Sequence, residues 1–225
     1  MIGPFALACL DMAGTTVRDD GLVDAAFTVA LRSVGVAAGT ERFAAAQRYV
    51  LETMGQSKAD VFAALLEPEE AVQATAEFAA AYEAMVAQGG ASAMPGATEL
   101  FAELRANQVL VALTTGFAPS TRDALLRALG WDDCIDLALS PADVGRGRPA
   151  PDMILGAMDR LGVVDPASVV VAGDTLSDLE AGTAAGAGAV IGVLSGAHDA
   201  ATLATGPQTA IIPDIRTLVE EMRST

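Results

Sequence analysis

Four short segments of the sequence combine acidic, hydroxyl or arginine side chains with glycine or proline. They are Asp11 to Thr16, Thr114 to Gly116, Arg146 to Pro151 and Gly173 to Asp178. Carboxylates such as Asp11 and Asp174 are hard oxygen ligands for Mg²⁺, and Asp178 can join them directly or through water. Thr115 can donate hydrogen bonds to phosphate oxygens, and Arg148 can neutralise negative charge on a reacting group. Because a carboxylate can also attack phosphorus to form an aspartyl-phosphate, these residue types predict phosphoryl-handling chemistry.

Strand ends are the elements that must position these side chains. The expected strands are Phe5–Leu10, Val109–Thr114, Asp136–Leu139, Val169–Ala172, Ala189–Leu194 and Ala210–Ile212, and the expected helices between and after them are Thr98–Asn107, Ser120–Leu129, Pro151–Leu161, Asp178–Ala185 and a terminal helix. The strands are short, continuous and β-branched, which is typical of a parallel sheet covered on both faces. We therefore predict a doubly wound α/β fold. Ligands in such folds bind beyond the carboxyl ends of the strands, where the four segments would lie.

A different pattern occupies the region from about Asp24 to Gln88. Alanine-rich segments with helical spacing predict helices at Ala25–Val34, Glu41–Tyr49, Ser57–Leu66 and Glu69–Gln88, and no strand pattern interrupts them. Gly89-Gly90 ends the helical pattern, and Pro95-Gly96 indicates a turn before the next helix. The predicted domains are an α/β core, residues 1–17 and 93–225, and an all-helical insertion, residues 18–92, placed after the first strand.

Composition excludes several classes of partner. The formal net charge is −16, which disfavours nucleic acid and anionic membranes because both carry dense negative charge. With 52% apolar and 19% charged residues, the chain can build a sizeable core. The start of the sequence lacks the basic region of a signal peptide, no apolar stretch is long enough to cross a bilayer, and the two cysteines lack metal-ligand spacing. We expect a cytoplasmic protein that acts on a small anionic molecule.

The order and spacing of the four segments resemble the haloacid-dehalogenase superfamily. The resemblance rests on Asp11-x-x-Gly14-Thr15, Thr115-Gly116, Arg148-Pro149 and Gly173-Asp174-x-x-x-Asp178, which span the whole chain. It implies that Asp11 is a nucleophile held beside Mg²⁺, and that the helical insertion is a small cap over the core. Phosphatases of this superfamily carry a second aspartate two residues after the nucleophile, which protonates the leaving alcohol. Here that position is Ala13, so ordinary phosphate-ester hydrolysis is disfavoured.

With alanine at this position, the chain resembles the phosphonatase-like family, whose members cleave carbon–phosphorus bonds. That family also uses a cap lysine in a Met-Gly-x-x-Lys motif, and this chain has Met54-Gly55-Gln56-Ser57-Lys58. The resemblance implies that Lys58 forms a Schiff base with the carbonyl of a small 2-oxoalkylphosphonate, so that carbon leaves as a neutral enamine. Lys58 is the only lysine among the 13 basic residues. Arginine cannot form an imine because its guanidinium stays protonated, so a chain that has otherwise replaced lysine retains one where amine chemistry would need it.

Two positions depart from the family pattern. The cap motif places histidine where this chain has Val61, and tyrosine tends to follow Thr-Gly where this chain has Phe117. Two alternatives therefore stay open: a phosphatase of small phosphate monoesters, and a non-catalytic relative that binds phosphorylated ligands. The sole histidine, His198, is expected to be a loop or helix-start residue.

The resemblance also assigns the remaining roles. It implies catalytic roles for Asp11, Lys58, Thr115 and Arg148, substrate contacts for Thr15, Gly55, Thr115, Gly116 and Arg148, and metal ligation by Asp11, the Ala13 carbonyl, Asp174 and Asp178. It further suggests a homodimer formed through the cap.

Overall fold

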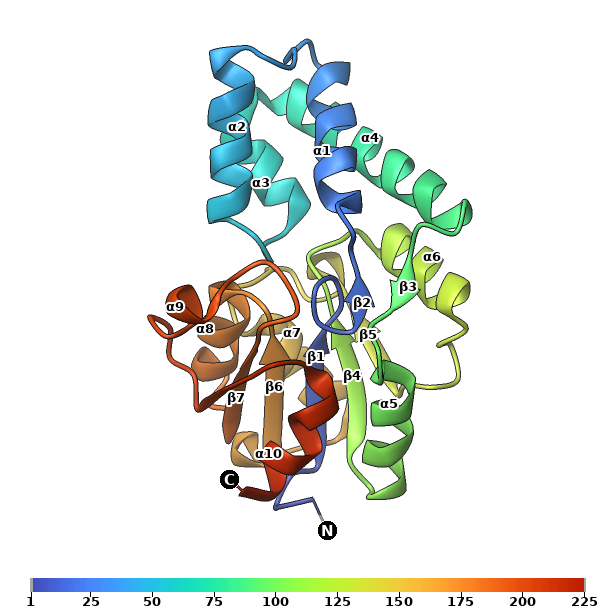
Figure 1. The fold of residues 1–225 in the computed structure, drawn as a ribbon, viewed down its shortest axis with the longest axis vertical. Helices are drawn as coiled ribbons and strands as arrows, with labels where there is room; N and C mark the ends of the chain where they lie inside the picture. The colour runs from blue at the N-terminus through green and yellow to red at the C-terminus, as the bar shows by residue number, and fades with distance from the viewer. Residues whose placement is uncertain (1, 225) are drawn as a thin grey trace.

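A six-stranded parallel sheet forms the centre of the molecule in the computed structural model, which describes residues 2–224 (Figure 1). Its strands, in spatial order, are β5 (Leu137–Leu139), β4 (Leu110–Thr114), β1 (Leu7–Asp11), β6 (Val169–Gly173), β7 (Ala189–Val193) and β8 (Ala210–Ile212). β1 lies between β4 and β6, and Asp11 pairs with Thr114 at the carboxyl end of the sheet. Asp11 is thus the last residue of its strand rather than the first residue after it. The predicted doubly wound parallel sheet is confirmed.

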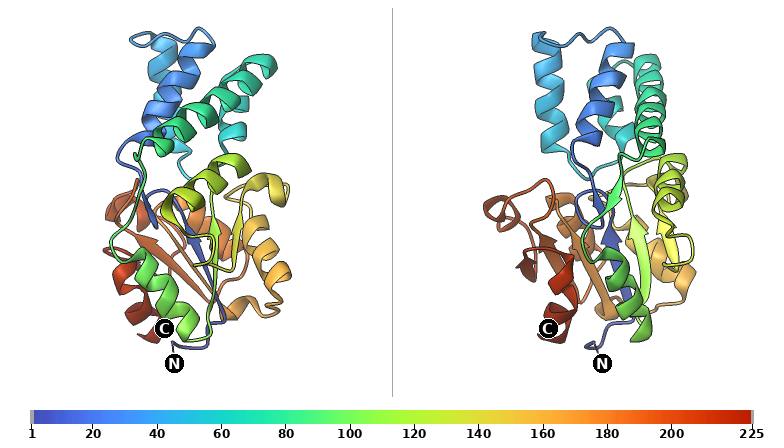
Figure 2. Two further views of the ribbon diagram at one scale, coloured as in Figure 1. Left: turned by 90° about the vertical axis from the view of Figure 1, so that its right-hand side faces the viewer. Right: turned by 45° about the vertical axis from the view of Figure 1, so that its right-hand side comes forward.

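Helices cover both faces of this sheet (Figure 2). They are α5 (Ala97–Ala106), α6 (Pro119–Leu129), α7 (Asp152–Leu161), α8 (Leu176–Ala184), α9 (Ala200–Leu203) and α10 (Leu218–Ser224), with short 3-10 turns η1 (Pro141–Asp143), η2 (Pro166–Ser168) and η3 (Ile215–Thr217). Successive residues of β1 enter different cores: Leu10 packs in the cluster that includes Phe101 of α5, and Cys9 packs in the cluster that includes Met153 of α7. Burial on both faces explains why the strands lack polar alternation.

A helical segment, α1–α4, lies beyond the carboxyl ends of the strands (Figures 1 and 2). It consists of α1 (Leu22–Ser33), α2 (Glu41–Glu52), α3 (Lys58–Leu65) and α4 (Pro68–Ala87), all within a few residues of the expected bounds. Its core is aromatic, with the rings of Phe27 and Phe78 at a centroid distance of 4.9 Å. The division of the chain into two domains stays a prediction, but the helices fall where the sequence pattern indicated.

Two connections lead into and out of this segment side by side. β2 (Val17–Arg18) pairs antiparallel with β3 (Ser92–Ala93), and the backbone N–H of Met94 donates to the carbonyl oxygen of Thr16 at 2.8 Å. Sequence analysis missed this pair because two residues per strand are too few to form a periodic pattern. The pairing ties the segment to the loop that follows Asp11.

Across residues 2–224, the helices are all too short or too polar to span a membrane.

Candidate active site

A small cavity at the carboxyl end of the sheet brings the predicted residues together. Its volume is about 30 Å³, and its lining includes Asp11, Lys58, Thr115, Arg148 and Asp174. Asp11 ends β1, Thr115 follows β4, and Asp174 follows β6. Because parallel strands end at the same edge of a sheet, residues more than 150 positions apart converge here. Ala13, Gly55 and Gly116 also line this cavity, whereas Thr15 lies beside it, hydrogen-bonded to Asp174.

Arg148 is the buried cation of the cavity. Its Nη1 donates to Asp11 Oδ1 at 2.6 Å and also pairs with the carboxylate of Asp178. Only 5% of Arg148 is exposed, and its buried Nε has no hydrogen-bond partner in the described part of the chain. A buried donor without a partner is costly. The guanidinium therefore retains one N–H that an anionic ligand can satisfy.

Asp174 is held by two loops and lies near a second buried carboxylate. Thr15 Oγ1 donates to its Oδ1 at 3.2 Å, and the backbone N–H of Ala197 donates to its Oδ2 at 2.6 Å. Burial, and then the negative charge of Asp11, raise the pKa of Asp174 to about 7. Gly14 allows this approach: its φ is +93°, and a Cβ there would lie 2.4 Å from Asp174 Oδ2. Two carboxylates held this close create a negative electrostatic potential that favours a bound cation.

Asp178 lies in the first turn of helix α8 and orients its neighbours. Its Oδ2 accepts hydrogen bonds from the backbone N–H of Thr175 at 3.1 Å and from Thr175 Oγ1 at 2.6 Å, while Oδ1 pairs with Arg148. Both carboxylate oxygens are thus engaged. In this arrangement Asp178 fixes Arg148 against the helix start, and contact with a metal through water, rather than directly, fits its surroundings.

Lys58 is buried at the start of α3, with its ammonium group between aromatic rings. Ser57 Oγ caps the helix by accepting from the backbone N–H of Asp60, which places Lys58 first in the helix. Its Nζ lies 5.7 Å from the ring centroids of Phe27 and Phe117, and 7% of the residue is exposed. Within residues 2–224, Lys58 forms no ion pair.

This environment favours the neutral amine. Burial, followed by the positive charge of Arg148, lowers the pKa of Lys58 to about 8, although the carboxylates of Asp11, Asp19 and Asp174 oppose the shift. A buried amine with a lowered pKa is a nucleophile near neutral pH.

Comparison with known proteins assigns the family. A family model described as haloacid dehalogenase-like hydrolase matches residues 5–186. The chain is 30% identical over 207 residues to a probable phosphatase IndB of Dickeya dadantii, covering 91% of this chain and 88% of that protein. The chain belongs to the haloacid dehalogenase-like hydrolases. This confirms the superfamily indicated by the four strand-end segments.

Other relatives of the hydrolase carry a more specific name. A phosphonoacetaldehyde hydrolase of Bacteroides fragilis is 33% identical over 123 residues, which is 53% of this chain but 45% of that enzyme. Among solved structures, a phosphonoacetaldehyde hydrolase-like protein of Oleispira antarctica superposes with a TM-score of 0.83 at 22% identity, covering 99% of this chain and 94% of that one. A hydrolase from Pseudomonas syringae superposes with a TM-score of 0.84 at 23% identity, covering 97% and 98% of the two chains. At these identities the structural matches establish the fold.

The donor set of the hydrolase fits Mg²⁺. Asp11 and Asp174 supply hard carboxylate oxygens, and the like-charge effect on the pKa of Asp174 is what a cation between them would remove. In the described residues no three His, Cys, Asp or Glu side chains are gathered into one metal cluster, and Asp178 faces Arg148 and Thr175 instead. Two carboxylates, a backbone carbonyl such as that of Ala13, and waters would then complete the shell, as is usual for Mg²⁺.

The sequence indicated a loop at Ser195–Asp199 but not its contacts with the hydrolase site. Ser195 to His198 follows β7 and holds the residues on either side of the cavity: Ser195 Oγ donates to the Gly14 carbonyl oxygen at 2.8 Å, and the His198 N–H donates to the Asp174 carbonyl oxygen at 3.2 Å. His198 Nδ1 also accepts from the backbone N–H of Leu176 at 3.1 Å. The rule that ligands bind beyond strand ends applies to β7 as well and could have identified this loop. His198, expected to be a loop or helix-start residue, does lie in that loop, one residue before the N-cap of α9.

Proposed function

We propose that this protein is a magnesium-dependent hydrolase that cleaves the carbon–phosphorus bond of a small 2-oxoalkylphosphonate. The observation that carries the proposal is the placement of Lys58. It is the only lysine of the chain, it is buried, and it lines the same cavity as the predicted nucleophile Asp11. Ala13 also lines that cavity and has no acid to protonate an alcohol. An amine and a carboxylate without a general acid suit a leaving group that departs neutral.

The residues of the chain then act in sequence. The neutral amine of Lys58 adds to the substrate carbonyl, water leaves, and one proton is taken up from solvent, giving a protonated imine. Asp11 attacks phosphorus, the carbon–phosphorus bond breaks, and its electron pair moves to the imine nitrogen to form an enamine. Water then hydrolyses the aspartyl-phosphate to inorganic phosphate. Protonation of the enamine carbon and hydrolysis of the imine release the carbonyl product and return the free Lys58.

Charge at the phosphonyl group is balanced by the surrounding residues. Arg148, with its unpartnered Nε, and the Thr115 hydroxyl would bind the phosphonyl oxygens. Asp11, Asp174 and the Ala13 carbonyl would hold Mg²⁺, with Asp178 acting through water. When bound, the ion offsets the negative charge of the phosphonyl oxygens, in a protein whose own net charge is −16. Thr15, Gly55 and Gly116 would shape the floor of the substrate site.

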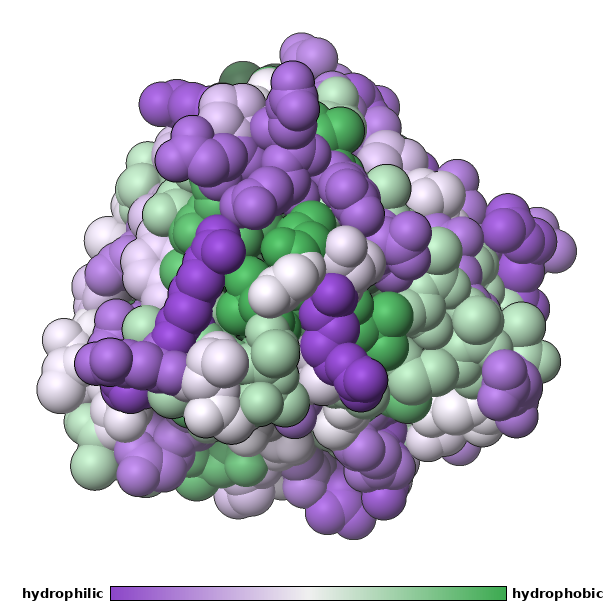
Figure 3. All heavy atoms as spheres, turned by 90° about the horizontal axis from the view of Figure 1, so that it is seen from above, coloured by the Kyte–Doolittle hydropathy of each residue, from purple (hydrophilic) through white to green (hydrophobic). Residues whose placement is uncertain are grey.

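The helical segment α1–α4 would act as the cap of this site, because Lys58 reaches the cavity from it. The predicted homodimer would form through the same segment. Val29, Leu51 and Val72 expose apolar side chains there, and Figure 3, which views that end of the molecule, shows apolar surface between polar residues. We retain the cytoplasm as the proposed location.

A phosphatase is the second candidate. Its specific support is coverage, because the relative named as a probable phosphatase matches 91% of this chain, whereas the phosphonoacetaldehyde hydrolase matches 53%. In that case water would replace the acid missing at Ala13, and Lys58 would only bind negative charge. A non-catalytic relative that binds phosphorylated ligands, the third alternative, would leave Asp11 without a role.

Borohydride trapping separates these candidates. The protein is incubated with phosphonoacetaldehyde and borohydride, and peptides are mapped by mass spectrometry. We expect a reduced adduct on Lys58, absent from the matched variant Lys58→Arg, which keeps the charge but cannot form the imine. Phosphate release from phosphonoacetaldehyde should fall at least ~1,000-fold in the same variant. Absence of an adduct, together with ready hydrolysis of phosphate monoesters by Lys58→Arg, would establish the phosphatase instead. Lack of turnover of either substrate class would support the non-catalytic relative.

A further inference from the structure

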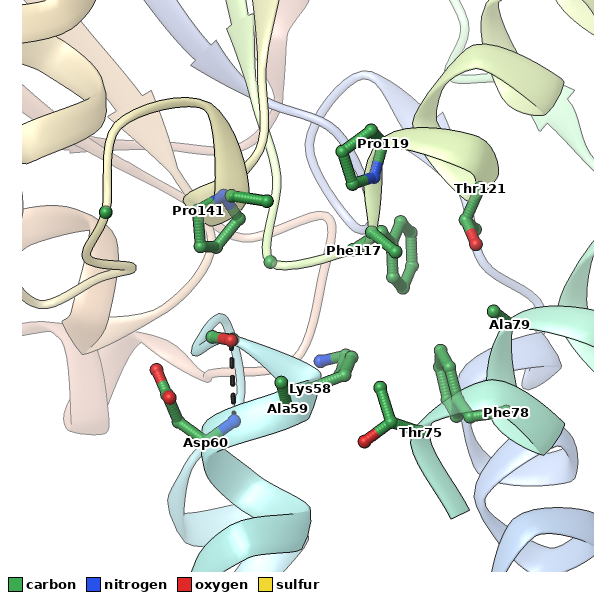
Figure 4. Close-up of a pocket in the computed structure, with 15 residues that line it drawn as sticks. Lys58, Ala59, Asp60, Thr75, Phe78, Ala79, Phe117, Pro119, Thr121 and Pro141 are labelled. Carbon is green, nitrogen blue, oxygen red and sulfur yellow. Dashed lines mark hydrogen bonds between the residues drawn. The ribbon is translucent and has the colours of Figure 1, made fainter. Parts of the chain in front are cut away.

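A second cavity borders Lys58 on the side facing the helical segment. Its volume is about 250 Å³, and it lies between α3 and α4 on one side and the loops after β4 and β5 on the other (Figure 4). Its walls include Lys58, Thr75, Phe78, Phe117, Pro119 and Pro141. We call this space the apolar cavity. It is partly open to solvent beside Asp60, an exposed residue that also lines it.

Two hydroxyl groups that line the apolar cavity already donate hydrogen bonds within the protein. Thr75 Oγ1 donates to the Ala71 carbonyl oxygen at 2.7 Å, and Thr121 Oγ1 donates to Glu83 Oε1 at 2.9 Å. The aromatic rings of Phe78 and Phe117 lie 6.1 Å apart and form one wall. Because the Thr75 and Thr121 hydroxyl groups donate within the protein and most of the other lining residues are apolar, a ligand here would contact mainly carbon atoms.

The cavity that holds Asp11 is small. Its volume is about 30 Å³, while one water alone needs roughly 10–15 Å³ of such space. It can take the phosphonyl group and the reacting carbons, so any larger substituent must extend elsewhere. Lys58, Gly116 and Phe117 line both this cavity and the apolar cavity, which places the two side by side at Lys58.

A third space next to the site has more charged residues in its lining, although Val23, Met54 and Met94 line it as well. This cavity, of about 270 Å³, is lined by Arg18, Asp19, Asp20 and Asp174, and Lys58 is not among its lining residues. A substituent on the carbon bonded to the Lys58 nitrogen would therefore extend into the apolar cavity and not toward these carboxylates.

We propose that the apolar cavity is a subsite for an apolar substituent on the carbonyl carbon of the substrate. The substrate class is thus a 2-oxoalkylphosphonate whose ketone carries an alkyl chain of several carbons or an aryl ring. This inference rests on the proposed function for the positions of the phosphonyl and carbonyl groups. Burial of each methylene then adds affinity, whereas an aldehyde substrate leaves the apolar cavity empty.

Binding of n-alkylphosphonates tests the subsite without any bond cleavage. Methyl-, butyl- and hexylphosphonate are titrated into the full-length protein in Mg²⁺-containing buffer by calorimetry. The dissociation constant should fall about threefold to fourfold per added methylene until the apolar cavity is filled. Ala79→Phe, which fills the space from α4, should abolish the chain-length gain and leave methylphosphonate affinity within about twofold of wild type. Ala80→Phe is the matched control, since Ala80 is exposed on the same helix and does not line the cavity.

Outcomes for the subsite and for the proposed function differ. Affinity that does not change with chain length, or a chain-length gain that survives in Ala79→Phe, overturns the subsite. If Ala79→Phe does not fold by circular dichroism, Ala142→Phe fills the cavity from the opposite wall and replaces it. A chain-length gain without a Lys58 adduct or phosphate release from the 2-oxoalkylphosphonates would remove the proposed function while keeping the subsite. Cleavage of phosphonoacetaldehyde with no higher kcat/KM for 2-oxohexylphosphonate would keep the proposed function and remove the subsite.

Discussion

The backbone N–H of Lys58 donates a hydrogen bond to the carbonyl oxygen of Gly116, with a donor–acceptor distance of 3.1 Å. This bond joins the first residue of α3 to the Thr-Gly turn that follows β4. The amine of Lys58 is thereby held against the same turn that carries Thr115. A backbone hydrogen bond thus joins the helical segment to the turn that follows β4.

Substitution of Gly116 tests this anchor. A Cβ at Gly116 would lie 2.2 Å from the carbonyl oxygen of Gln56 and 3.1 Å from that of Gly55, so the loop before Lys58 must move away. We expect Gly116→Ala to lower kcat/KM about 100-fold, because a displacement of roughly 1 Å at a reacting group has that effect. Gly192→Ala is the control, since a Cβ there would meet side-chain atoms rather than backbone, with Leu203 Cδ1 nearest at 3.2 Å and Ile211 Cγ1 at 3.5 Å. Equal activity of the two variants would contradict the role of this contact.

The pH dependence of activity should report the Lys58 amine. Its pKa is lowered to about 8, chiefly by burial, and only the neutral amine adds to a carbonyl. Carbon–phosphorus cleavage should therefore rise about tenfold per pH unit up to pH 8 and level off above it. An exposed lysine would place this inflection near 10.4. Rates of imine trapping from pH 6 to 10 check the prediction, and an inflection above about pH 9.5 would count against a buried amine.

The same lowered pKa affects stability. Between pH 8 and about 10.4 the unfolded lysine holds a proton that the folded one lacks, so the free energy of unfolding rises with pH across this window. Below pH 8 both states are protonated and this contribution no longer changes. Lys58→Met should flatten that part of the stability profile measured by chemical denaturation. An unchanged slope between wild type and variant would show that Lys58 titrates alike in both states.

Removal of the Asp174 carboxylate should abolish the stabilisation of the protein by Mg²⁺. In metal-free buffer Asp174→Asn should melt higher than wild type, because burial and the charge of Asp11 both disfavour the Asp174 carboxylate. Added Mg²⁺ should raise the Tm of wild type by several degrees, since an ion at about 100 times its Kd adds about 2.7 kcal/mol, and should barely move that of Asp174→Asn. Glu180→Gln, an exposed change on α8, is the control. A full Mg²⁺ response in Asp174→Asn would place the ion elsewhere.

An acid introduced at position 13 should change the reaction. Ala13 is partly exposed and lines the cavity with Asp11, so an aspartate there can reach a leaving oxygen. We expect Ala13→Asp to increase hydrolysis of alkyl phosphates about 100-fold or more, the range of general acid–base catalysis. Ala13→Asn has nearly the same size without the proton and serves as control. If both variants hydrolyse alkyl phosphates equally, the missing acid does not limit that activity.

Much of this molecule follows from its sequence. The parallel sheet, the flanking helices and the run of helices after β1 could be predicted because continuous apolar strands and helical spacing are local patterns. Asp11, Thr115, Arg148 and Asp174 could be proposed as one site because each lies at or beyond the carboxyl end of a strand and parallel strands end together. The short β2–β3 pair could not, since two residues per strand form no periodic pattern. The hydrogen bonds that join the Ser195–His198 loop to Gly14 and Asp174 could not either, since they link residues far apart in the sequence.

The sequence alone determined which side-chain groups are available: a carboxylate at position 11, no acid at position 13, and one side-chain amine in the entire chain. Only the tertiary structure decided where that amine lies. Lys58 is buried beside Asp11 by the Ser57 cap, by its hydrogen bond to Gly116 and by the rings of Phe27 and Phe117. This burial lowers the pKa of Lys58. The tertiary structure likewise turned Asp178 toward Arg148 and opened an apolar cavity behind the amine. Desolvation and shape depend on residues distant in the chain, and no local spacing encodes them.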